Sequence, residues 1–194
     1  MRAFIAISLP EGVRRRLARQ QEAFRSALNS SQNNEGHGVK WAPPDGIHLT
    51  LKFLGEITEA KVQQVIAGLT PLGDFPSIAL EVRGFDCFPD FRRPRVFWAG
   101  VVAPPALRDL AARIEAAMAK LGFPSEARSF SPHLTLARFS GARPRPGLES
   151  LARESGEWTS GQFEVSRFSL FESKLSAGAP AEYLAVANFA KLQA

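Results

Sequence analysis

The sequence His-Leu-Thr-Leu stands at residues 48–51 and recurs at residues 133–136. The two copies contain two of the three histidines in this 194-residue chain, and His48 and His133 lie 85 positions apart. Imidazole has an ordinary pKa close to neutrality, so two histidines in matched settings can serve as the acid and the base of one reaction. The duplication therefore predicts a paired proton-transfer site, of the kind that suits phosphoryl chemistry.

Each copy has the period of two that is typical of a β-strand, because leucines alternate with polar residues. We expect His48 and Thr50 on one strand face, and His133 and Thr135 on one face of a second strand, with the leucines turned towards a core. A hydroxyl beside each imidazole would donate to an anionic oxygen, so each copy is expected to form half of a site. A single copy would more often be an ordinary amphipathic strand, and the second copy is what favours function.

The order strand, helix, histidine strand, helix, strand is predicted twice along the chain. In the first half these elements are expected at residues 4–8, 11–28, 48–51, 58–69 and 78–85. In the second half they are expected at residues 95–102, 105–121, 133–139, 148–154 and 162–171, with a last strand at 183–189. Ser8 and Glu11 have the spacing of a capping box, and Thr58 is expected to cap the helix that follows it.

This duplicated order predicts an α+β fold of two pseudo-symmetric lobes. Each lobe is expected to be an antiparallel sheet with helices on the outside, and the His-x-Thr strands are expected to face a central cleft. We expect one bilobal domain over residues 1–194, with a half boundary near residue 90, because neither half alone is clearly large enough to bury a good core. Residues 29–38 and 140–147 are expected to be surface loops, with His37 a solvated residue of the first.

The composition narrows the setting of the protein. The formal net charge is +5, and the 24 basic residues comprise 18 arginines and six lysines. Arginine binds phosphate well, but an arginine-rich surface alone is weak evidence for a phosphate ligand. Cys87 is the only cysteine, which excludes an intrachain disulfide, and the start of the chain has no long apolar run. We expect a monomeric cytoplasmic protein with no membrane contact.

Neither a cofactor nor a metal site is predicted. The glycines are scattered and match no nucleotide-binding fingerprint. Two residues after each motif histidine, where a second metal ligand would be expected, the chain has Thr50 and Thr135. A metal held by the histidine pair is therefore the less favoured alternative.

Beyond these two motifs, the chain resembles the two-histidine phosphoesterases and, within them, the RNA 2′,3′-cyclic phosphodiesterases, also called 2′-5′ RNA ligases. The resemblance covers nearly the whole chain. It is carried in order by residues 1–10 (MRAFIAISLP), 41–45 (WAPPD), 52–55 (KFLG), 88–89 (FP), 92–96 (RRPRV), 98–100 (WAG), 133–138 (HLTLAR), 173–175 (SKL), Gly178 and Tyr183. Two stretches depart from the group: residues 29–38 are longer than expected, and residues 183–189 keep only the aromatic and apolar spacing.

The resemblance implies hydrolysis of a ribose 2′,3′-cyclic phosphate at an RNA or oligonucleotide end, giving a 2′-phosphate and a free 3′-hydroxyl. The residues suggest how: one imidazole takes a proton from the attacking water and the other protonates the departing ribose oxygen. We assign His133 as the base and His48 as the acid. Thr50, Thr135 and Arg138 are expected to hold the non-bridging phosphate oxygens. Two ordinary imidazoles predict a bell-shaped pH dependence with both limbs within about two units of neutrality.

Further residues beside the two motifs are candidates for the site. On a regular strand Arg138, five residues beyond His133, faces away from the site, and a bulge, a strand end or side-chain reach would be needed to bring it round. Phe53 holds the equivalent place in the first copy. It is interpreted as a core residue in preference to one that stacks on a nucleobase. Trp41 and the arginines of residues 92–95 are expected to border the cleft.

Other functions stay open at this point. Joining RNA ends through 2′-5′ linkages is the same chemistry reversed, and a non-catalytic RNA-end-binding module would also keep arginines and aromatic residues. A 2′-5′ oligoadenylate or a cyclic phosphate on ADP-ribose is a closer alternative substrate.

Overall fold

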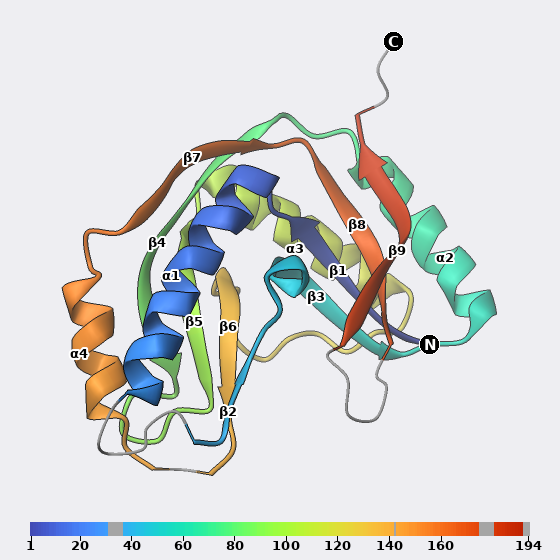
Figure 1. The fold of residues 1–194 in the computed structure, drawn as a ribbon. Helices are drawn as coiled ribbons and strands as arrows, with labels where there is room; N and C mark the ends of the chain where they lie inside the picture. Colours follow the sequence, from blue (N-terminus) through green and yellow to red (C-terminus); the bar gives the residue numbers. More distant parts are fainter. Residues whose placement is uncertain (31–36, 142, 175–180, 192–194) are drawn as a thin grey trace.

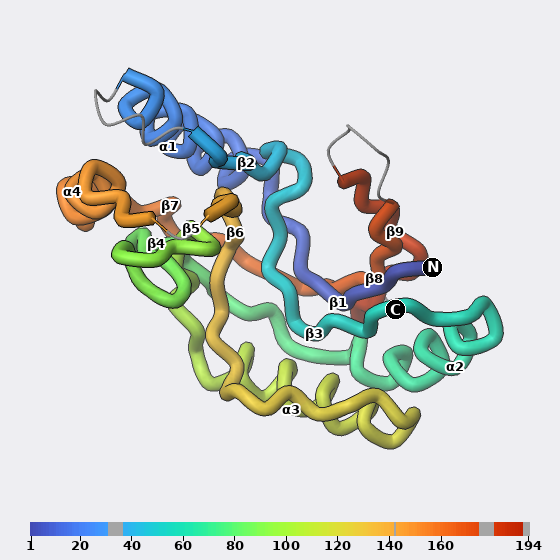
Figure 2. The backbone as a smooth tube through the Cα atoms, turned by 90° about the horizontal axis from the view of Figure 1, so that it is seen from below, coloured from blue at the N-terminus to red at the C-terminus, as the bar shows by residue number. Residues whose placement is uncertain are grey.

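The computed structural model describes residues 1–30, 37–141, 143–174 and 181–191. Within these residues, antiparallel strands form one curled sheet, and Figure 2 shows helices α1 and α3 far apart from each other around it. The strands are β1 (Arg2–Ser8), β2 (Val39–Trp41), β3 (His48–Glu56), β4 (Ile78–Phe88), β5 (Val96–Val102), β6 (His133–Phe139), β7 (Thr159–Val165), β8 (Arg167–Lys174) and β9 (Glu182–Ala190). The helices are α1 (Glu11–Asn29), α2 (Glu59–Leu69), α3 (Pro105–Lys120) and α4 (Pro146–Glu154), with short 3-10 turns η1 (Pro44–Gly46) and η2 (Thr70–Leu72).

The two histidine strands are neighbours at the centre of the sheet. The strand order is β7-β4-β5-β6-β3-β1-β8-β9, and the short strand β2 also pairs with β6 but stands outside this order (Figure 1). β3 and β6 are joined at one pair, Leu49 with Leu134, which are the equivalent leucines of the two motifs. The expected α+β fold with an antiparallel sheet is confirmed, and its two halves are related about this central pair.

We call β3, β1, β8 and β9 the His48 half, and β6, β5, β4 and β7 the His133 half. The first half of the sequence gives β4 to the His133 half of the sheet, and the second half gives β8 and β9 to the His48 half. β4 precedes residue 90 but lies in the His133 half, and β8 follows residue 90 but lies in the His48 half. The two sheet halves therefore share the chain between them, and the single domain with a boundary near residue 90 stays a prediction.

One predicted strand is wrong. Residues 162–171 were expected to form a single strand, but Ser166 separates β7 from β8. β7 pairs with β4 and β8 pairs with β1, at opposite sides of the sheet. Ser166 and Arg167 are both exposed, between buried Val165 and Phe168, so the alternation changes phase at this point. The chain passes there from one half of the sheet to the other.

Of the two helix N-caps predicted from the sequence, the structure confirms Thr58 and not Ser8. Thr58 caps α2 as expected, because its Oγ1 accepts a hydrogen bond of 3.3 Å from the Lys61 backbone N–H. The capping box at Ser8 is wrong. Ser8 is the last residue of β1, where it pairs with His48, and Pro10 precedes the first turn of α1 without a side-chain cap.

The helices pack on the core face of the sheet. Phe24 of α1 makes edge contacts with Phe85 and Phe97 of the His133 half, at centroid distances of 4.9 and 5.1 Å. On α3, buried Ile114 and Met118 belong to the same continuous core. This packing leaves the opposite face of the sheet to the polar members of the motifs.

Two expectations concern the surface. Residues 31–36 of the expected loop 29–38 lie outside the described residues, while His37 is described and its side chain is exposed, as expected. No helix among the described residues is long and apolar enough to cross a membrane. The monomeric state and the cytoplasmic location stay predictions.

Candidate active site

The two motif histidines make the same backbone contact. His48 Nδ1 lies 2.7 Å from the carbonyl oxygen of Gly46, and His133 Nδ1 lies 2.7 Å from the carbonyl oxygen of Ser131. A carbonyl oxygen only accepts, so Nδ1 carries the hydrogen in both rings. Each neutral ring therefore keeps Nε2 as the nitrogen that can take up a proton, and the backbone fixes this tautomer twice.

A β-bulge follows the first motif. The pairing of β1 with β3 passes from Ala6 opposite Thr50 to Ile5 opposite Lys52, so Leu51 is an extra residue. Leu51 and Lys52 are both buried as a result, and the next residue returns to the face of His48 and Thr50. Lys52 points to the core side, where its Nζ donates to Glu115 Oε2 at 2.8 Å.

The same bulge follows the second motif. Trp98 of β5 is opposite Thr135, and the adjacent Phe97 is opposite Ala137, so Leu136 is the extra residue. Val96, on the same face of β5 as Trp98, is opposite Arg138. The pairing thus places Arg138 on the face of His133 and Thr135. Of the three ways in which the sequence allowed this, a bulge, a strand end or side-chain reach, the structure has the bulge.

The matched bulge also corrects the interpretation of Phe53. This side chain is 58% exposed, so the core assignment is wrong. Its ring lies on the His48 face, with its centroid 6.2 Å from that of Phe4. Lys52 occupies the core-side position instead, because the extra residue at Leu51 shifts the alternation by one.

Aromatic rings enclose His48. The Phe4 ring stacks on the imidazole at 4.6 Å, the Tyr183 ring meets it edge-on at 5.0 Å, and Phe171 lies at 6.4 Å. This burial lowers the pKa of His48 from 6.5 to about 4, and the hydrogen bond to Gly46 opposes the shift only in part. The expectation that both pH limbs lie within two units of neutrality therefore does not hold for His48.

The surroundings of His133 differ. Phe88 meets its ring edge-on at 5.0 Å and Trp98 lies at 6.0 Å, with these two rings stacked on each other at 4.9 Å. Trp98 Nε1 is buried and has no hydrogen-bond partner among the described residues. Phe171 was not singled out from the sequence, and Phe4, Phe88, Trp98 and Tyr183 were noted only within stretches that resemble the family.

Trp41 lies on the other side of the sheet from the histidines. It pairs with Ala137, which is fully buried on the core face, and its ring meets the core residue Phe97 edge-on at 6.3 Å. The expectation that Trp41 borders the cleft is therefore wrong. Its neighbour Lys40 pairs with Arg138 and is exposed, so Lys40 is a basic residue of the site face that sequence reasoning missed.

The arginine cluster of residues 92–95 lies on the turn between β4 and β5. Its three arginines are exposed, and the Asp90 carboxylate accepts the backbone N–H groups of Arg92 and Arg93. The turn adjoins Val96, the partner of Arg138, so the cluster stands at the same end of the sheet. Over the described ranges, no group of three or more His, Cys, Asp or Glu side chains could hold a metal ion.

The two His-x-Thr pairs on adjacent antiparallel strands are the arrangement expected from the resemblance to two-histidine phosphoesterases. The model of the 2′-5′ RNA ligase superfamily matches residues 13–176, and this chain belongs to that family. The RNA 2′,3′-cyclic phosphodiesterase of Methanothermobacter thermautotrophicus is 34% identical over 181 residues, 93% of this chain and 94% of that relative. The enzyme of the same name from Aeropyrum pernix is 36% identical over 154 residues, 79% of this chain and 87% of the relative.

Solved structures agree with this assignment. The protein TT0787 of Thermus thermophilus is similar with a TM-score of 0.75 and 30% identity, over 98% of this chain and 97% of that chain. E. coli LigT complexed with 3′-AMP is similar with a TM-score of 0.74 and 26% identity, over 99% of this chain and 98% of that chain. The α+β fold predicted from the duplicated order of strands and helices is confirmed.

Proposed function

We propose that this protein hydrolyses 2′,3′-cyclic phosphate ends of RNA to 2′-phosphomonoesters. The observation that carries the proposal is the matched pair of imidazoles, each held by a backbone carbonyl two residues earlier so that Nε2 remains for proton transfer. The relatives named RNA 2′,3′-cyclic phosphodiesterase support the substrate class.

In the proposed reaction a water oxygen bonds to phosphorus and the bond from phosphorus to the ribose 3′ oxygen breaks. One imidazole Nε2 accepts a proton from the water, and the other donates a proton to the 3′ oxygen. Thr50, Thr135 and Arg138 share the face of the histidines and are proposed to donate to the non-bridging oxygens as charge builds. No cofactor takes part in these steps.

We retain His133 as the base and His48 as the acid. An imidazolium whose pKa is lowered by burial is a strong proton donor, which suits a poor leaving group such as a ribose alkoxide. The same burial leaves His48 neutral at pH 7 in the free protein. A bound phosphate anion would raise its pKa again, so substrate binding should bring a proton to His48.

The matched geometry of the two histidines favours hydrolysis over RNA-end binding and over ligation. A module that only binds RNA ends has no use for two imidazoles with the same tautomer fixed by the same contact. Ligation through a 2′-5′ linkage runs the same proton transfers in reverse and needs two RNA ends held together. Hydrolysis needs only one end and water.

The direct test is an assay of a short RNA that ends in a 2′,3′-cyclic phosphate, with the position of the product phosphate determined by NMR. We expect the 2′-phosphate with a free 3′-hydroxyl. Absence of turnover by the intact protein, or exclusive formation of the 3′-phosphate, would contradict the proposal. A 2′-5′ oligoadenylate and a cyclic phosphate on ADP-ribose, assayed in parallel, rank the closer alternative substrates.

A further inference from the structure

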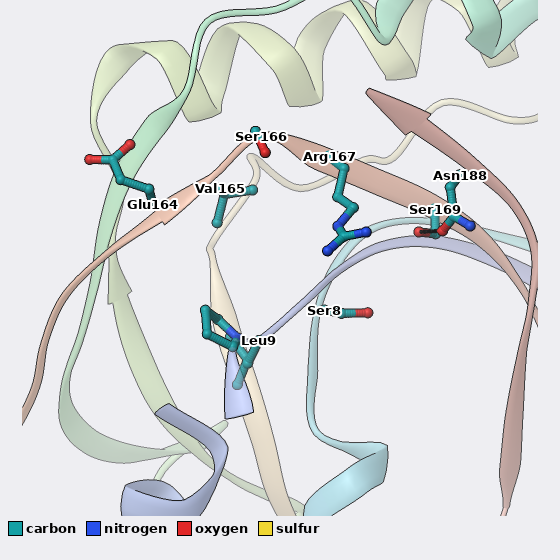
Figure 3. A pocket seen from close by; sticks show the side chains of 9 residues that line it. Ser8, Leu9, Glu164, Val165, Ser166, Arg167, Ser169 and Asn188 are labelled. Carbon is teal, nitrogen blue, oxygen red and sulfur yellow. Dashed lines mark hydrogen bonds between the residues drawn. The ribbon is translucent and has the colours of Figure 1, made fainter. Parts of the chain in front are cut away.

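A pocket continues the site face of the His48 half beyond His48. Its volume is about 300 Å³, and it lies where β1 leads into α1 and where β7 passes into β8. Its lining is mainly polar: Ser8, Leu9, Pro10, Glu164, Val165, Ser166, Arg167, Ser169 and Asn188. Figure 3 shows the Arg167 side chain extending from β8 towards Ser8.

Strand pairing relates this pocket to the catalytic face. Ser8 of β1 is the pairing partner of His48. On the other side of β1 the pairing ends with Ala6 opposite Ser169, and Ser8 and Arg167 follow two residues beyond this pair and line the same pocket. Residues two apart on a strand share a face, so Arg167 lies on the face of Ser169, Ala6 and His48.

Among the described residues, Arg167 is a positively charged side chain of the pocket without a bonding partner. Over the described part of the chain, neither the Arg167 guanidinium nor the Ser8 hydroxyl has a hydrogen bond or an ion pair. Ser169 Oγ donates to Asn188 Oδ1 at 2.7 Å, so this pair is engaged with itself. The acidic lining residue, Glu164, accepts a hydrogen bond from Ser77 Oγ, and in Figure 3 its carboxylate points away from Arg167.

The equivalent position in the other half of the sheet is closed. Gly100 pairs with His133 as Ser8 pairs with His48. A Cβ atom on Gly100 would lie 2.7 Å from the carbonyl oxygen of Arg83, so backbone occupies the space that is open beside Ser8. The pocket is therefore present only beside the His48 strand, so a bound substrate can extend from the two histidines towards the His48 half but not in the equivalent way towards the His133 half.

We infer that the Ser8–Arg167 pocket binds the phosphate on the 5′ oxygen of the nucleotide that carries the cyclic phosphate. This inference rests on the proposed function, because it places the cyclic phosphate between His48 and His133. The neighbouring phosphate of the same nucleotide then falls on the His48 side, within reach of the long Arg167 side chain. Arginine is the preferred partner for such a group, which it can bind with two parallel hydrogen bonds.

The inference makes the enzyme sensitive to what precedes the terminal nucleotide. A charge-assisted hydrogen bond at a partly open site corresponds to about a tenfold gain in affinity. The gain is expected for a 5′-phosphate on a single nucleotide and for the phosphodiester of a longer RNA chain. A nucleoside 2′,3′-cyclic phosphate without a 5′-phosphate lacks it.

The test compares kcat/KM for two nucleoside 2′,3′-cyclic phosphates that differ only in a 5′-phosphate. For the unmodified protein we expect the 5′-phosphate to raise kcat/KM by about tenfold. In Arg167→Ala this ratio should fall close to one. In the matched control Arg113→Ala, which removes an exposed arginine of α3, the ratio should stay unchanged.

Because the readout is a ratio, a general loss of folding or activity in Arg167→Ala cancels out. An undiminished ratio in Arg167→Ala would overturn the inference and leave the proposed function intact. Failure of the unmodified protein to hydrolyse either substrate would instead refute the proposed function.

A second arm examines the phosphodiester of an RNA chain. Dinucleotides with a cyclic phosphate end are compared with an internal phosphodiester and with a neutral methylphosphonate in its place. We expect the neutral linkage to lose the gain in the unmodified protein and to make no difference in Arg167→Ala, because the two changes remove one interaction. A gain that survives the neutral linkage would contradict the inference.

Discussion

His48 and His133 sit in the same tetrapeptide, make the same Nδ1 contact and precede the same bulge, yet their surroundings differ. Three aromatic rings enclose His48 and lower its pKa to about 4, whereas two rings stand near His133. The repeated backbone geometry leaves Nε2 as the basic nitrogen in both rings. The side chains around them, which are not repeated, make the two groups unlike.

Removal of either histidine should cause the largest loss. We expect His48→Ala and His133→Ala each to lower kcat by about 10²-fold to 10⁴-fold, because each deletes one proton transfer. The double variant should lose far less than the product of the two losses, because the pair acts as a unit. Steady-state kinetics on a cyclic-phosphate RNA measure all three.

His37→Ala is the control for this comparison, because it removes the third histidine from an exposed position. No measurable change is expected. If His37→Ala were as damaging as His133→Ala, or if a motif histidine could be removed with full activity, the paired-histidine mechanism would be wrong.

The threonines should matter less than the histidines. Thr50→Ala and Thr135→Ala are each expected to lower kcat by about 10-fold to 10³-fold, since each removes one donor to the developing charge on phosphate. Serine at either position keeps the hydroxyl and should retain most of the activity. Equal losses in the alanine and serine variants would show that the threonine methyl group, and not its hydroxyl, is what counts.

The buried state of His48 should appear in the pH dependence of stability. As the pH falls below 6.5 the unfolded chain gains a proton on His48 that the folded protein does not take up until about pH 4. Stability contributed by neutral His48 is therefore full above pH 6.5 and is lost between pH 6.5 and 4, by about 3 kcal/mol in total. Urea unfolding across this window, with His48→Gln as the variant that cannot titrate, measures it. Parallel curves for the two proteins would contradict the prediction.

Arg138 and Phe53 hold equivalent positions after the two bulges, and their alanine variants should change different kinetic constants. Arg138→Ala is expected to lower kcat/KM by about 10-fold to 10²-fold, through the loss of a cation beside the phosphate. Phe53→Ala should raise KM by about tenfold and leave kcat nearly unchanged, as loss of a stacked base would. Identical effects of both variants on kcat and KM would remove the distinction between the two halves.

Chelation should have the smallest effect. The proposed donors to phosphate are threonine and arginine side chains, so we expect turnover to continue after thorough treatment with EDTA. Activity that disappears with chelator and returns with zinc or magnesium would show that a metal ion takes part.

The sequence predicted the parts of the site that depend on local pattern. The duplicated tetrapeptide predicted His48, Thr50, His133 and Thr135 as site residues, and the period of two put each pair on one face. The duplicated order of strands and helices predicted the fold class, and the resemblance to a known family implied the reaction. These predictions needed no knowledge of which strands pair.

The orientations of Arg138, Phe53 and Trp41 depend on pairing between distant strands. Arg138 faces the site because Leu136 is an extra residue opposite β5, and Phe53 is exposed because Leu51 is an extra residue opposite β1. Trp41 turns to the core because β2 pairs with β6 opposite Ala137. No pattern within a single strand carries this information.

The break at Ser166 has the same origin, since β7 and β8 find their partners in different halves of the sheet. In the first motif the apolar and polar residues keep alternating through Leu51, Lys52 and Phe53, so the sequence there gives no sign of the bulge.

The assignment of His48 as the acid and His133 as the base is tested most directly with a cyclic phosphate substrate in which sulfur replaces the 3′ oxygen. A thiolate leaves without needing a proton, so loss of the acid should be rescued and loss of the base should not. The rates of His48→Ala and His133→Ala are compared with that of the unmodified protein on this substrate. We predict that His48→Ala regains most of its lost activity while His133→Ala stays impaired. Rescue of His133→Ala alone would reverse the two roles, and rescue of neither would contradict the assignment of His48 as the acid.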